Sequence, residues 1–143
     1  MTKKSKIIKR LKTVRKHYIN TIRDFPYASH SDENLCKVAL AVWGATENAT
    51  STLVDLFPEV RERDMSLDQK IVYLGENMNA LPSGVTGNYF EQKRILHDEC
   101  NSVITLNLFS SLNRNAVIDE INYAGKFLDN IEKAVEKKLT YKE

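Results

Sequence analysis

The sequence predicts an all-α protein, a single antiparallel bundle of about five helices that spans residues 1–143 as one domain. Apolar residues recur every three or four positions along most of the chain, which is the spacing of an amphipathic helix. Five glycines and three prolines are few for this length, so long helices with few turns are expected. No segment alternates strictly between apolar and polar residues, as a half-buried strand would. The helices are therefore expected to bury their apolar faces against one another.

The first expected helix covers about residues 3–24. Its apolar side chains form one stripe, and basic residues occupy much of the remaining circumference. The stripe consists of Ile7, Leu11, Val14, Tyr18, Ile22 and Phe25. Pro26 ends this helix, because a proline disfavours the helical conformation in the residue before it.

A second helix is expected from residues 29–32 to Pro58. A serine at its start can accept hydrogen bonds from the free backbone amides of the first turn. Gly44 and the small residues Ala45, Ala49 and Ser51 are expected to let a neighbouring helix approach closely. The apolar face comprises Leu35, Val38, Ala39, Val42, Leu53, Leu56 and Phe57.

Three further helices follow in the sequence. Ser66, with Gln69 three residues later, forms a capping box for the third, and Asn88 with Glu91 marks the start of the fourth. Residues 113–115 break the chain before the fifth helix. The apolar positions of the third helix are Leu67, Ile71, Leu74 and Met78. Those of the fourth helix are Leu96, Cys100 and Val103. Those of the fifth helix are Ile118, Ile121, Gly125, Leu128, Ile131 and Val135.

Charge is divided unevenly along the chain. Residues 1–23 hold nine Lys and Arg and no acidic residue, whereas the other 120 residues hold 12 basic and 19 acidic ones. The two parts therefore carry formal charges of +9 and −7, within a total of +2. A basic helix on an acidic body can meet an external anionic partner, or it can fold back onto the body itself.

The basic first helix is the main candidate for a binding site. Such a helix can dock into an acidic protein groove, it can neutralise phosphates of a nucleic acid, or it can simply be a helix of the bundle with a solvated basic face. No base-reading motif surrounds it, and the absence of Trp and Phe from residues 1–23 argues against a membrane surface. A protein partner is therefore favoured over nucleic acid. The candidate contact residues are Lys9, Arg10, Lys12, Arg15 and Lys16.

A second candidate site lies in the expected fourth helix. Arg94, His97 and Asn101 share one flank of that helix. Imidazole titrates near neutral pH and a guanidinium can offset developing negative charge, so Arg94 and His97 could cleave a phosphodiester. The alternative interpretation is a polar cluster on the helix surface, in which Arg94 pairs with Glu91 or Asp98.

No cofactor, metal site or membrane span is expected. His17, His30 and His97 lie far apart in the sequence, and Cys36 and Cys100 do not form a Cys-x-x-Cys pair. Both cysteines fall on apolar helical faces, which suits reduced core residues of a cytoplasmic protein. No stretch approaches the roughly 18 consecutive apolar residues of a membrane span.

Two stretches within residues 66–101 carry a resemblance to a known family, "SLDQKIVYLGENM" and "YFEQKRILHDECN". A short helix that leads into a helix with an Arg and a His resembles the HEPN superfamily of helical bundles, and within it the mannitol-operon-repressor type. HEPN ribonucleases separate the Arg from the His by four to six residues, whereas Arg94 and His97 have two between them. The resemblance therefore implies a member without the nuclease motif. Such members tend to be regulatory proteins or interaction partners, and they are usually dimeric.

We therefore expect a small non-catalytic regulatory or adaptor protein that acts through protein–protein binding, with an apolar face used for homodimerisation. Transcriptional regulation and phage or host defence are settings that suit such a protein. Two alternatives stay open. One is a nucleic-acid-binding protein that uses the basic N-terminal helix, and the other is a degenerate HEPN-type ribonuclease that uses Arg94 and His97.

Overall fold

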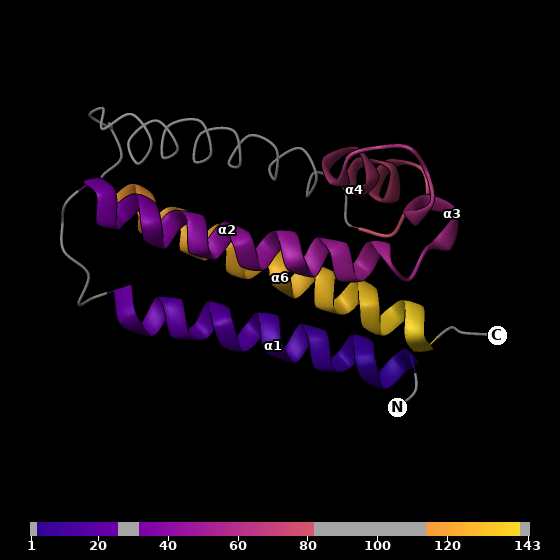
Figure 1. The fold of residues 1–143 in the computed structure, drawn as a ribbon, viewed down its shortest axis with the longest axis horizontal. Coiled ribbons are helices and arrows are strands. Elements are labelled where there is room, and N and C mark those ends of the chain that lie inside the picture. The colour runs from indigo at the N-terminus through magenta and orange to yellow at the C-terminus, as the bar shows by residue number, and fades with distance from the viewer. Residues whose placement is uncertain (1–2, 26–31, 82–113, 141–143) are drawn as a thin grey trace.

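The computed structural model describes residues 3–25, 32–81 and 114–140 and confirms the all-α class (Figure 1). The described residues contain no strand. Their helices are α1 (Lys3–Asp24), α2 (Asp32–Val54), α3 (Pro58–Arg61), α4 (Leu67–Glu76) and α6 (Arg114–Thr140). The helix expected around residues 88–103 lies outside the described residues, as do the serines expected to cap α2.

Three long helices, α1, α2 and α6, form the body of the bundle (Figure 1). Helix α1 runs antiparallel to both others, whereas α2 and α6 run in the same direction. Arg10 in the first half of α1 accordingly meets Asp55 just beyond the end of α2. Tyr18 in the second half of α1 meets Ile121 near the start of α6. The short helices α3 and α4 lie beside the end of α2.

Helix α2 lies at the centre and packs against all four other described helices. Trp43 is fully buried and stacks on Tyr123 of α6, with ring centroids 6.2 Å apart. The predicted apolar stripes are confirmed by burial at most positions, including Val14 in α1 and Ile131 in α6. Ile118 differs, since it is 39% exposed.

A close helix–helix approach occurs at Gly125, which the sequence places on the apolar face of the last helix. A Cβ atom built at Gly44 would meet no described residue within 4 Å, so the described part of the chain places no close neighbour there. A Cβ at Gly125 would lie 2.5 Å from the Tyr18 hydroxyl oxygen. That hydroxyl donates a 2.6 Å hydrogen bond to the carbonyl of Ile121, and burial raises the pKa of Tyr18. Gly125 therefore makes room for a buried contact between α1 and α6.

Some helix ends lie where the capping residues and prolines of the sequence predict them, and others do not. Helix α1 ends at Asp24, as Pro26 predicted, and the capping box of α4 is complete, with both Ser66–Gln69 hydrogen bonds present. Helix α2 ends at Val54 rather than at Pro58. Pro58 instead begins α3, a position where its missing N–H breaks no helical hydrogen bond. The predicted break at residues 113–115 extends too far, because residues 114 and 115 already belong to α6; residue 113 lies outside the described residues.

Candidate functional site

The two arginines among the candidate residues of α1 are bound within the fold. Arg15 Nη2 lies 2.7 Å from Glu132 Oε1 and 2.8 Å from Asp129 Oδ1, and its Nε donates to Glu132 Oε2 at 3.1 Å. The hydrogen bonds to Glu132 raise the pKa of Arg15 above its already high value. The side chain is only 25% exposed. Arg15 therefore fastens α1 to α6 across the bundle.

Arg10 plays a similar part on the opposite flank of α1. Its Nη1 lies 2.6 Å from Asp55 Oδ2, just after the end of α2. Both side chains are partly exposed, so solvent screens this pair and its contribution to stability is small. For Arg10 and Arg15, the basic charge of the first helix thus neutralises the acidic body of the same chain.

The lysines of α1 are placed differently from these arginines. Lys9, Lys12 and Lys16 are exposed, and none has an ion-pair partner within the described part of the chain. The five candidate residues therefore divide into two structural anchors and three free cations. The free cations lie along grooves on both flanks of α1.

The groove between α1 and α2, here called the basic groove, has a volume of about 570 Å³. No acidic residue is among the described residues that line it. The hydroxyls of Thr13 and Thr52 donate to the carbonyls of Lys9 and Asn48, so their protons are already used. Donors for a bound anion would therefore come from the Lys and Asn side chains. The lining residues are Lys6, Lys9, Arg10, Thr13, Val14, Asn48 and Thr52.

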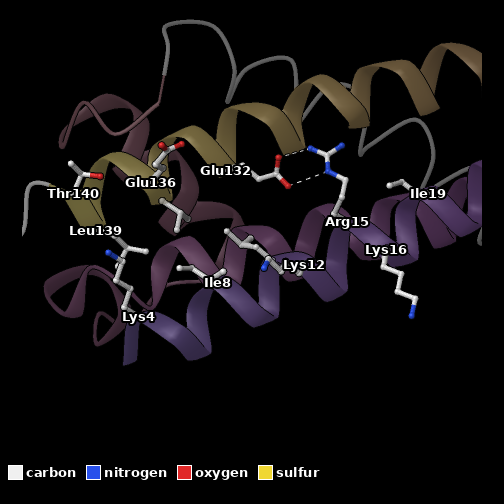
Figure 2. Close-up of a pocket in the computed structure, with 12 residues that line it drawn as sticks. Lys4, Ile8, Lys12, Arg15, Lys16, Ile19, Glu132, Glu136, Leu139 and Thr140 are labelled. Carbon is white, nitrogen blue, oxygen red and sulfur yellow. Dashed lines mark hydrogen bonds and ion pairs between the residues drawn. The ribbon is translucent and has the colours of Figure 1, made fainter. Parts of the chain in front are cut away.

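The groove between α1 and α6, here called the mixed groove, has a volume of about 600 Å³ (Figure 2). Apolar side chains from both helices line it, and two isoleucines of α1 remain strongly exposed there, Ile8 at 37% and Ile19 at 52%. Lysines lie on the α1 side and glutamates on the α6 side. The lining residues are Lys4, Ile8, Leu11, Lys12, Arg15, Lys16, Ile19, Glu132, Val135, Glu136, Leu139 and Thr140.

The exposed isoleucines of the mixed groove are not among the site residues that the sequence predicts. The signal was present, because Ile8 and Ile19 interrupt the basic face and lie eleven positions apart, which brings them back to one side of a helix. They were passed over because they lie off the main apolar stripe. The stripe packs into the core, whereas these two residues form a second apolar strip toward solvent.

The other candidate chemistry is placed only in part. Arg94 and His97 lie outside the described residues, as does Cys100. Cys36 is buried and forms no disulfide bond within the described residues. The part of the chain that the structure describes holds no group of three metal-ligating side chains, and none of its helices is long and apolar enough to cross a membrane.

Comparison with known proteins adds no relative to this description. No family model matches the chain, and neither a curated protein nor a solved structure matches it. The class of protein is therefore defined by the fold and the grooves alone: an α-helical bundle whose first helix is flanked by one basic and one mixed groove.

Proposed function

We propose that the chain is a small, non-catalytic regulatory or adaptor protein of the cytoplasm that binds an Asp- and Glu-rich segment of another protein in the basic groove. The observation that supports this proposal is the lining of the groove, which among the described residues contains Lys6, Lys9 and Arg10 and no acidic side chain. Carboxylates accept hydrogen bonds from ammonium groups, so an acidic segment is the complementary partner.

Lys6 and Lys9 are the residues expected to carry the binding. They are three positions apart on α1 and therefore neighbours on the helix surface. Arg10 already pairs with Asp55, so its charge is largely offset within the fold. Binding through exposed lysines is screened by salt and reversible, which suits a regulatory contact.

An acidic protein is favoured over nucleic acid by the way α1 uses its arginines. Arginine is the side chain best suited to bidentate recognition of phosphate. Arg10 and Arg15 are both held by carboxylates of the same chain. A helix that bound a phosphate backbone would be expected to leave its arginines available for binding. In α1, lysines are available instead.

Fluorescence anisotropy with three labelled probes tests this proposal: a Glu-rich peptide, a single-stranded RNA and a DNA duplex. The wild-type protein should bind the peptide, and the variant Lys6→Glu/Lys9→Glu should bind it at least about tenfold more weakly because repulsion replaces attraction. Lys133→Glu is the matched control, since Lys133 is exposed on α6 beside Asn79 and Leu81, away from α1.

Two results would overturn the proposal. One is peptide binding that is unchanged in Lys6→Glu/Lys9→Glu. The other is RNA or DNA binding that is tighter than peptide binding at equal salt and falls steeply from about 50 to 200 mM salt, as release of counterions from phosphates requires.

A further inference from the structure

The mixed groove differs from the basic groove in a way that indicates its occupant. Apolar side chains of both helices form part of its walls, and two of them, Ile8 and Ile19, are exposed at its α1 side. Exposed apolar surface rimmed by charged groups is typical of a protein–protein contact. The basic groove has no comparable pair of exposed isoleucines among its lining residues.

The two sides of the mixed groove carry opposite charges. Lys4, Lys12 and Lys16 lie along the α1 side, and Glu136 lies on the α6 side (Figure 2). Glu132, on the same side as Glu136, is already held by Arg15. A partner that fits this groove therefore needs an acidic edge opposite α1 and a basic edge opposite α6. The chain itself presents that pair of edges, on two antiparallel helices.

We propose that a second copy of this chain occupies the mixed groove in a two-fold symmetric dimer. A two-fold axis parallel to the helices places α1 of each copy over α6 of the other. The lysine edge then meets the glutamate edge twice, because every contact in such a dimer occurs in both directions. A two-fold axis across the helices would instead place α1 on α1 and oppose lysines with lysines.

This arrangement also accounts for the exposed isoleucines. An axis parallel to the helices keeps each residue at its own level along the groove. Lys12 and Glu136, which line the same groove, therefore stay near each other in level when they come from different copies. The four helices, α1 and α6 from each copy, form an antiparallel bundle that covers Ile8 and Ile19.

The dimer proposal is independent of the acidic-partner proposal, since the basic groove lies on the other flank of α1.

Charge exchange between the two edges tests the proposal on the full chain. Sedimentation velocity over a concentration series should show a wild-type dimer. Lys12→Glu and Glu136→Lys should each weaken dimerisation by about tenfold or more, because each change creates two like-charge oppositions. An equimolar mixture of the two variants should dimerise again, since each lysine edge then meets a glutamate edge, and the double variant Lys12→Glu/Glu136→Lys should recover self-association.

Further variants separate the proposed face from other causes. Ile19→Lys should also weaken dimerisation without loss of helicity, because Ile19 is 52% exposed and contributes little to the core. Lys133→Glu should leave the dimer unchanged. The proposal fails if the wild-type chain stays monomeric at about 100 μM, where even a weak micromolar dimer would form. It also fails if a dimer forms that ignores both charge variants, or if their mixture does not reassociate. Peptide binding in the same samples reports on the basic groove separately.

Discussion

A methyl group added at Gly125 tests how tightly α1 and α6 pack around Tyr18. The new Cβ would lie 2.5 Å from the Tyr18 hydroxyl oxygen, a distance that forces a shift. That hydroxyl is not a free end of a flexible chain, because it donates to the buried carbonyl of Ile121. The shift must therefore break this hydrogen bond, move the helices apart, or do both.

Three contributions determine the size of the effect. Replacing Gly by Ala inside a helix stabilises by about 1 kcal/mol. Overpacking costs about 1–3 kcal/mol, and a buried hydroxyl left without its partner costs about 1–3 kcal/mol more. We therefore expect Gly125→Ala to lower the free energy of unfolding by about 1–5 kcal/mol, against the sign of helix propensity.

Urea unfolding followed by far-UV circular dichroism measures this change. Gly44→Ala is the control, because no described residue lies within 4 Å of its new methyl, and it should stabilise by about 1 kcal/mol. In a Tyr18→Phe background the hydroxyl is gone and the nearest remaining ring atom lies 3.3 Å away. There Gly125→Ala should lose most of its penalty. A Gly125→Ala protein as stable as wild type, or an equal penalty in the Phe background, would refute the reasoning.

Three further predictions concern other contacts of the bundle. Arg15→Gln should lower the free energy of unfolding by about 1 kcal/mol, because solvent partly screens the ion pair that it removes. Glu132→Gln should lower it little further in the Arg15→Gln background, which a double-mutant cycle of urea unfolding checks. Burial raises the pKa of Tyr18, so in the folded state this hydroxyl keeps its proton above pH 10, whereas the unfolded chain loses it. The contribution of the Tyr18 hydroxyl to the stability of the folded state is therefore complete below about pH 10, and it declines as the pH rises through the pKa of the folded state. In thermal melts between about pH 9 and 11, Tyr18→Phe should flatten that decline. Ser66→Ala should cost about 1 kcal/mol by removing the α4 cap, with Gln69→Ala costing less; amide exchange in α4 reports both.

The first helix shows how much of this protein can be predicted from local sequence. Its length, its buried stripe and its end before Pro26 all follow from spacing and from the conformational limits that proline imposes. The same reasoning could not distinguish Arg15 from Lys16. Both are basic residues on one helix, and only the folded chain brings Asp129 and Glu132 beside Arg15, more than a hundred residues away in sequence.

Glycine and proline illustrate the same limit. Gly44 and Gly125 both offer space to a neighbour, and among the described residues only Gly125 has one, because its side of α6 faces Tyr18. Pro58 can end one helix or begin another, and the turn after Val54 decides this through backbone hydrogen bonds to Ser51, Leu53 and Val54. The glycine case depends on a contact between two helices, and the proline case on the turn that precedes it; neither is contained in the spacing of apolar residues.

The shared direction of α2 and α6 bears on the opening stretch of the chain. Each helix carries partial negative charge at its C-terminal end. Because α2 and α6 are parallel, these two ends lie at the same pole of the bundle, and the N-terminal part of α1 lies at that pole too (Figure 1). The first turn of α1 has no acidic residue, so its lysines oppose its own dipole. The partial negative charges at the C-terminal ends of α2 and α6 attract these lysines and offset the repulsion within α1. A peptide of residues 3–24 alone should therefore be far less helical than the same residues in the bundle.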